Sequence, residues 1–145
     1  MSTILVKNGR IVTMNRKRDI IVGDILIKDD RIAEIQATSH YTHPDRVIDA
    51  TDKVIIPGLI QTHIHLTQTL FRGQADDMEL LDWLKKRIWP LEGTHDAESN
   101  YYSAKLGISE LIMGGTTALV NMETVHYTDE AINAIGESGI RAITG

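Results

Sequence analysis

The sequence predicts an α/β protein, in which an all-β module over residues 1–56 is followed by alternating strands and helices over residues 57–145. In the first region apolar and polar residues alternate with the period of two that a half-buried strand requires, and turn residues interrupt the pattern. After Pro57-Gly58, strand-like apolar runs alternate with stretches that carry apolar residues at helical spacing. This alternation is typical of a parallel sheet covered by helices.

The all-β module contains two places where we expect hairpins. Asn8-Gly9 supplies the positive φ that a two-residue hairpin turn requires, and Asp29-Asp30 separates two further strand-like segments. The polar residues 15–19 and 36–46 are predicted to be loops. The strands expected in this module are residues 3–7, 10–14, 24–28, 31–35, 47–49 and 53–56.

The second region is predicted to contain three parallel strands, at residues 59–65, 116–121 and 140–144. Helices are expected from Asp76 to Pro90, from near Thr94 to Gly114-Gly115, and from Thr128 to Gly139. In the first of these, Asp76 and Glu79 have capping-box spacing and Pro90 is the expected stop. Its apolar stripe consists of Leu80, Leu81, Leu84 and Ile88.

Three parallel strands do not close a barrel, because closure takes eight strands and about 250 residues. The sequence stops at Gly145, with a predicted strand and no helix after it. We therefore expect the chain to be the first third of a longer β/α protein.

The composition excludes several functional classes. The 145 residues include no cysteine, so a disulfide framework, a thiolate zinc site and a thiol nucleophile are all excluded. Fifteen Lys and Arg against 20 Asp and Glu give a net charge of −5, and aromatic residues are only 5%, so nucleic acid is not an expected partner. The apolar runs are too short for a transmembrane helix or a secretory signal, so we expect no membrane partner and a cytoplasmic location.

His63 and His65 are the strongest candidates for chemistry. They lie two residues apart at the C-terminal end of a predicted strand, where both side chains project from one face and can converge on a metal ion. In β/α barrels this end of the strands carries the catalytic groups, and imidazole is the commonest metal ligand. The alternative is a chance triplet, with two strand-end histidines that hydrogen-bond to their neighbours.

A metal site needs at least one more protein ligand than this pair supplies. The candidates within the chain are His95, His126, Glu92 and Glu123. His126 and Glu123 follow the second parallel strand and could face the same end of the sheet, although loop residues of this kind are more often solvated. His95, at a predicted helix start, is more typical of a capping or solvated residue.

Three other polar positions have simpler interpretations. His40 and His43 lie in the polar loop beside Pro44, where a solvated side chain is expected. Arg72 belongs to a polar turn whose default role is to connect a strand to a helix, with a functional role as the less common alternative.

Several segments resemble the amidohydrolase superfamily. They are VIIPGLIQTHIHLTQTLFRG at Val54–Gly73, the preceding NGRIVTMN, WPLE at Trp89–Glu92 and GGTTALVNME at Gly114–Glu123. Within the superfamily the chain is most similar to the branch of adenosine-type deaminases and triazine chlorohydrolases. Its nearest resemblance there is to 5′-deoxyadenosine, S-adenosylhomocysteine and methylthioadenosine deaminases.

This resemblance implies a fold and a set of site residues. Residues 1–56 would be the N-terminal part of a β-sandwich, and residues 57–145 the first part of a metal-dependent (β/α)8 TIM-type barrel that is incomplete in this chain. The resemblance implies that His63 and His65 are the first two ligands of one divalent metal ion, with Zn²⁺ preferred and Fe²⁺ or Mn²⁺ as alternatives. It also implies that Glu92 binds substrate hydroxyls. The other metal ligands and the acid–base residues are expected beyond Gly145, so no catalytic residue is assigned within the chain.

The activity implied is hydrolytic deamination of an adenosine-type nucleoside or a related N-heterocycle by a metal-activated water. One alternative is a chlorohydrolase or a guanine or cytosine deaminase of the same superfamily. The other is a catalytically silent fragment that works only with a complementary chain. The expected partner is a small-molecule substrate, and we expect either a homo-oligomer of the complete protein or a need for the remainder of the barrel.

Overall fold

The computed structural model of the chain describes residues 2–123 and 126–145. The described residues form two compact units, Met1–Pro57 and Gly58–Gly145. Among these residues, none of the helices combines the length and the apolar character needed to cross a lipid bilayer.

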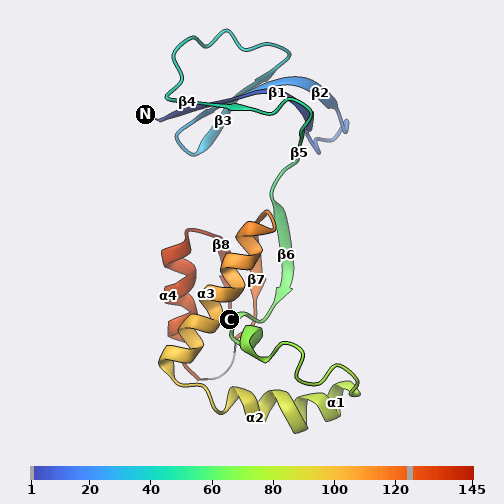
Figure 1. The fold of residues 1–145 in the computed structure, drawn as a ribbon, viewed down its shortest axis with the longest axis vertical. Coiled ribbons are helices and arrows are strands. Elements are labelled where there is room, and N and C mark those ends of the chain that lie inside the picture. The colour runs from blue at the N-terminus through green and yellow to red at the C-terminus, as the bar shows by residue number, and fades with distance from the viewer. Residues whose placement is uncertain (1, 124–125) are drawn as a thin grey trace. The chain divides into compact units, whose positions relative to one another are not determined.

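The described part of the first unit is a five-stranded sheet (Figure 1). Its strands are β1 (Thr3–Val12), β2 (Ile20–Lys28), β3 (Arg31–Gln36), β4 (Arg46–Asp49) and β5 (Val54–Ile55). They have the order β3-β2-β1-β4, with β5 also paired to β1. The pairs β1–β2 and β2–β3 are antiparallel, whereas β4 and β5 run parallel to β1.

The hairpin predicted at Asn8-Gly9 is wrong, because β1 continues through both residues. Asn8 does have a positive φ of 64°, but the chain uses it for an irregularity in the pairing of β1 with β2 between Val6 and Gly9. There the Asn8 N–H donates to Oδ1 of the buried Asp24, at 2.9 Å. A bulge and a tight turn require the same backbone conformation, so the dipeptide alone does not distinguish them.

The second hairpin prediction is confirmed. Strands β2 and β3 pair antiparallel on either side of Asp29-Asp30, and Asp29 has a φ of 54°. The polar segment predicted as a loop over residues 15–19 lies in the connection between β1 and β2.

The second unit contains a three-stranded parallel sheet in its described residues (Figure 1). Its strands are β6 (Leu59–Ile64), β7 (Thr116–Asn121) and β8 (Arg141–Thr144), in the order β6-β7-β8, so the prediction of three parallel strands is confirmed. Helices α3 (Ala97–Met113) and α4 (Thr128–Ser138) cover one face of this sheet. The buried core of this unit is formed by Leu66, which follows β6, and by residues of α3 and α4, namely Ala104, Ile108, Ala131, Ala134 and Ile135.

The opposite face of this sheet is apolar and exposed. The strand register places Ile60, Val120 and Ile143 on this face, and Ile60 and Ile143 are 66% and 72% exposed. Parallel sheets are ordinarily covered on both faces, so an exposed apolar face of this kind is unusual for a parallel sheet.

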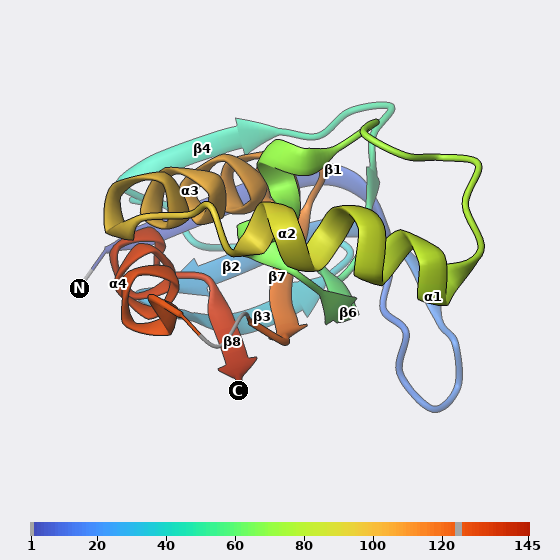
Figure 2. The same cartoon turned by 90° about the horizontal axis from the view of Figure 1, so that it is seen from below.

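A further helical run connects β6 to α3. It begins with the 3₁₀ helix η1 (Leu66–Phe71) and, after a loop, continues as α1 (Leu80–Trp83), the π-helix η2 (Leu84–Ile88) and α2 (Trp89–Glu92). Figure 2 shows α1 and α2 as parts of one continuous helix. Ile88 is buried, whereas Leu80 and Leu81 of the predicted stripe are exposed.

Two boundary predictions for this run are wrong. Pro90 does not end the helix, because the chain widens into a π turn just before it, in which the Trp89 N–H donates to the Leu84 carbonyl. A π turn relieves the clash between a proline ring and the carbonyl four residues earlier. The predicted capping box is not formed either, since within the described residues the helix follows Glu79 without a side-chain cap.

The ends of α3 and α4 differ slightly from the prediction. Helix α3 begins after Asp96 rather than near Thr94, because Asp96 and Ser99 form a reciprocal capping box. Thr128 is the first residue of α4 rather than its cap, since the preceding Tyr127 has a φ of 58°. Gly139 ends α4 at a φ of 72°, as expected for a C-terminal glycine.

Candidate metal centre

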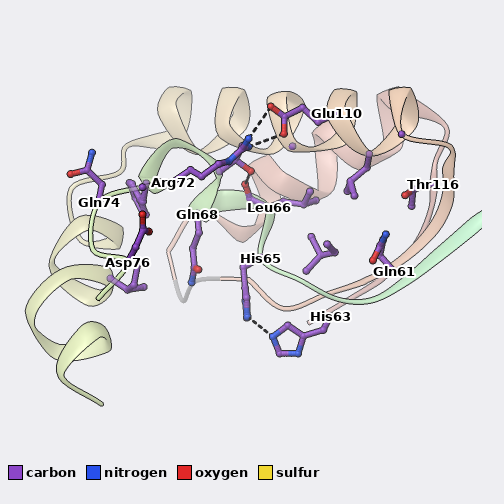
Figure 3. A pocket seen from close by; sticks show the side chains of 18 of the residues that line it. Gln61, His63, His65, Leu66, Gln68, Arg72, Gln74, Asp76, Glu110 and Thr116 are labelled. Carbon is purple, nitrogen blue, oxygen red and sulfur yellow. Dashed lines mark hydrogen bonds and ion pairs between the residues drawn. The ribbon is translucent and has the colours of Figure 1, made fainter. Parts of the chain in front are cut away.

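His63 and His65 converge at the carboxyl end of β6. Their Nε2 atoms lie 3.0 Å apart, and their ring planes meet at 81° (Figure 3). The pairing of β6 with β7 is irregular between Gln61 and Ile64, and Ile64 packs against the core beneath the helices. The two imidazoles therefore point away from that core and share one space.

A backbone carbonyl fixes the orientation of the His65 ring. Its Nδ1 lies 2.8 Å from the Met122 carbonyl oxygen. A carbonyl only accepts hydrogen bonds, so Nδ1 carries the proton and, in the neutral ring, Nε2 keeps its lone pair. Metal-binding histidines typically use one nitrogen for such a second contact and the other for the metal.

The geometry of this pair fits a divalent cation. Two nitrogens at about 2.0 Å from a tetrahedral zinc ion are about 3.3 Å apart, close to the separation of 3.0 Å between the two Nε2 atoms. Imidazole nitrogen is a suitable ligand for zinc, iron and manganese alike. Within the described ranges no cluster of three His, Cys, Asp or Glu side chains forms, so this part of the chain brings together two candidate ligands.

Two cavities meet at His63. The larger, about 670 Å³, lies beside β6 and is lined by His63, His65, Gln68, Arg72 and Glu110 among others (Figure 3). The smaller, about 270 Å³, lies at the carboxyl ends of the three strands and is lined by His63, Asn121 and Thr144 among others. A molecule bound in either cavity would have access to the imidazole pair.

Glu92, predicted to bind substrate, is half-buried at the end of α2. Its Oε1 accepts a hydrogen bond of 2.7 Å from Nε2 of Gln68, which lines the same cavity as His63 and His65. Gln68 was not singled out by sequence reasoning. The structure thus connects Glu92 to this cavity through one intervening amide.

The other candidate ligands are engaged elsewhere or exposed. The His95 ring nitrogens contact the Thr67 carbonyl at 2.8 Å and Ser99 Oγ at 3.1 Å, and the ring lies against Phe71. Glu123 accepts from the Asn121 side chain through Oε1. His126 is exposed, as are the loop residues His40 and His43.

Arg72 forms a bidentate ion pair with Glu110 on α3, with distances of 3.2 and 2.8 Å. Hydrogen bonding to this carboxylate, with its charge, raises the pKa of Arg72 above its usual value. The pair ties the loop after η1 to α3, which agrees with the connecting role expected for this turn.

Asn121 is a second site residue that sequence reasoning missed. It is 3% exposed at the end of β7, and its side-chain oxygen accepts from the Leu66 N–H at 3.1 Å. Its Nδ2 donates to Glu123 Oε1 and to Thr144 Oγ1. A single asparagine in a strand carries no motif, so only the spatial arrangement identifies it.

Comparison with known proteins identifies related sequences. A sequence description of the amidohydrolase family matches residues 54–145. The chain is 44% identical over 142 residues to the 5′-deoxyadenosine deaminase of Methanobrevibacter smithii. The aligned region covers 98% of this chain and 32% of that enzyme. The chain thus spans about a third of the length of the curated relatives it matches.

Solved structures share the fold. The crystal structure of an adenosine deaminase from Xanthomonas campestris with bound zinc superposes with a TM-score of 0.87 at 27% identity, over 98% of this chain and 33% of that one. A triazine hydrolase from Arthrobacter aurescens superposes with a TM-score of 0.88 at 23% identity, over 99% of this chain and 36% of that one. Since the family match extends over well more than half of the residues, the chain belongs to the amidohydrolase family.

Proposed function

We propose that this chain is the N-terminal part of a metal-dependent amidohydrolase that hydrolytically deaminates an adenosine-type nucleoside or a related N-heterocycle. The observation that carries the proposal is the pair of converging Nε2 atoms of His63 and His65, 3.0 Å apart at the carboxyl end of β6. The similarity to a 5′-deoxyadenosine deaminase and to a zinc-containing adenosine deaminase supports this reaction class.

In this proposal residues 1–56 belong to a β-sandwich, and residues 57–145 contribute the first three strands of a (β/α)8 barrel. The exposed apolar face of β6, β7 and β8 would become the inside of that barrel. The remaining metal ligands and the acid–base residues would come from protein outside these 145 residues, consistent with the relatives being about three times as long.

His63 and His65 would hold the metal ion through their Nε2 atoms, with the His65 ring held in place by the Met122 carbonyl. When bound, a divalent metal ion supplies Lewis-acid activation of water near neutral pH. We favour zinc, in view of the zinc-containing relatives, over iron or manganese. The reaction would replace the exocyclic amino group of the heterocycle with oxygen and release ammonia.

Glu92 would recognise the sugar of the substrate. With Oε1 occupied by Gln68, its other oxygen can accept from a ribose hydroxyl. This arrangement favours a nucleoside over a free base.

A second candidate is a chain without catalytic activity of its own, which acts only together with a complementary chain. The observation that favours it is the small share, 32%, of the relative that the chain covers.

Metal analysis tests the proposal directly. We predict that the protein, expressed with any residues encoded after Gly145, holds about one zinc ion per chain, and that the double variant His63→Ala/His65→Ala loses it. His43→Ala, which removes an exposed loop histidine, is the matched control. Ammonia release from 5′-deoxyadenosine, adenosine, guanine and cytosine then identifies the substrate class. Unchanged metal content in the double variant rejects the assigned site.

A further inference from the structure

Asn121 connects the carboxyl ends of all three described parallel strands. Its side chain accepts from the Leu66 N–H, two residues after the end of β6, and donates to Thr144 Oγ1 on β8 at 3.0 Å. The adjacent Met122 N–H donates to the Ile64 carbonyl, and the Met122 carbonyl accepts from His65 Nδ1. Asn121 and the residue after it therefore hold the segment that carries His65 at three points.

The donors and acceptors around Asn121 define how its amide must lie. The Leu66 N–H requires an acceptor, whereas the Glu123 carboxylate requires a donor. Asparagine provides both from one short planar group. A buried residue of the same size without polar atoms would leave the Leu66 N–H and one Glu123 oxygen unpaired, and the strand ends would have to shift to find new partners.

We infer that Asn121 is a positioning residue for the His63–His65 pair, an inference that rests on the proposed metal-binding function. The described hydrogen bonds of the Asn121 side chain go to Leu66, Glu123 and Thr144 rather than to the imidazoles. It fixes the Leu66 backbone, and hence the residue before it, while Met122 fixes the His65 ring through Nδ1. If the Leu66 N–H loses its acceptor, His65 Nε2 moves relative to His63 Nε2, and the two cease to fit one ion.

Two charge-matched variants test this inference in the protein with any residues encoded after Gly145. Asn121→Leu removes the amide without changing charge. Asn121→Asp/Glu123→Gln keeps the net charge and exchanges donor and acceptor between the two side chains, so the new carboxylate is not left facing a second one. Asn133→Leu makes the same change as the first variant at an exposed position on α4 and serves as the control.

The readouts are zinc affinity, from competition with a chromophoric chelator, and hydrogen exchange of the Leu66 amide. We expect Asn121→Leu to bind zinc about 10- to 100-fold more weakly and to lose Leu66 protection, which is the usual size of effect for residues behind metal ligands. The double variant should bind within about threefold of the wild type, as should Asn133→Leu.

The outcomes separate the inference from the function on which it rests. Zinc affinity unchanged in Asn121→Leu overturns the inference, as does a folded double variant that binds as weakly as the single one. If Asn121→Leu does not fold, the double variant alone decides. A wild-type protein that takes up no zinc contradicts the proposed function, and Leu66 exchange in the two variants then decides the role of Asn121 without any metal.

Discussion

Asp96 is the residue that determines where α3 begins. Its Oδ1 accepts from the Ser99 N–H at 2.8 Å, while Ser99 Oγ accepts from the Asp96 N–H at 3.0 Å. The hydrogen bonds from Ser99 lower the pKa of the Asp96 carboxyl below its usual value. The charged form of this carboxylate is therefore the one that stabilises the helix.

We predict that Asp96→Ala lowers the thermal unfolding temperature at pH 7 because it removes the cap. Since the folded pKa is depressed, the contribution of Asp96 is present above its unfolded pKa of about 4 and is lost as the pH falls through the lower folded value. The difference between wild type and variant should thus shrink below about pH 4. Asp96→Asn, which keeps an acceptor without a titrating charge, should retain most of the stability and show no such pH dependence. A constant difference between pH 7 and pH 3 contradicts this account.

At the level of residues, the sequence predicted the pair His63 and His65 but not what holds them. A His-x-His triplet at a strand end carries its own geometric consequence, since alternate residues share a face. Asn121 lies 55 residues from Leu66, whose N–H donates to it, so no local pattern could indicate it. The contact between Gln68 and Glu92, 24 residues apart, is equally non-local. Capping by Asp96 is local, yet Thr94 two residues earlier is also among the preferred capping residues by type.

Helix α3 approaches the 3₁₀ helix η1 through small residues. Ser103 Oγ donates to the Thr67 carbonyl at 2.9 Å and accepts from the Leu70 N–H at 3.3 Å. One turn further along α3, a Cβ on Gly107 would lie 2.6 Å from Thr69 Oγ1 and 3.2 Å from Leu66 Cδ2. The absence of a side chain at Gly107 is therefore what allows η1, which follows directly after His65, to lie where it does.

Substitution of two glycines by alanine should have opposite effects. We predict that Gly107→Ala lowers the free energy of unfolding by about 1–3 kcal/mol, because the methyl group overpacks the contact with η1. Gly136→Ala on α4 should raise it by about 0.5–1 kcal/mol, because alanine is the better helix former and, apart from the neighbouring residues and backbone of α4 itself, the structure describes no atom within 4 Å of the new methyl group. Urea titration of both variants measures the two values. If Gly107→Ala leaves the free energy of unfolding unchanged, η1 is able to move away from the added methyl group.

The helices and strands were predictable where the sequence pattern was compatible with a single local structure. Strand β7 has the predicted bounds, Thr116–Asn121, because a β-prone run stands between two glycines and a polar loop. The turn at Asn8-Gly9 and the stop at Pro90 were wrong for a shared reason. Each residue restricts the backbone to a conformation that two structures use, a hairpin or a bulge in one case, and a helix end or a π turn in the other.

In the second unit as a whole, one side of the sheet is covered and the other is not. In its described residues β6 and β8 each pair with one strand, and the face with Ile60 and Ile143 is exposed. Unpaired strand edges and apolar faces of this kind favour association with other chains.

We predict that the 145-residue chain on its own self-associates. Light scattering after gel filtration should give a mass above 16.2 kDa that rises with concentration. Ile143→Lys, which places a charge on the exposed face, should reduce the association, whereas Met113→Lys, at an exposed position at the end of α3, should not. A monomer with cooperative unfolding would contradict this expectation. The layers of the second unit could be inferred from the strand–helix alternation, but the partner of the exposed face could not, because an apolar pattern shows that a face favours burial and does not show what packs against it.

The junction at Asn121 has a thermodynamic consequence for the second unit. Because one amide joins the ends of β6, β7 and β8, an ion bound at the proposed site between His63 and His65 would also favour the docked position of β8. Linkage is reciprocal, so whatever loosens the last strand weakens retention of the ion by the same factor. A fault in the packing of α4 would then be detected as loss of metal, far from any ligand.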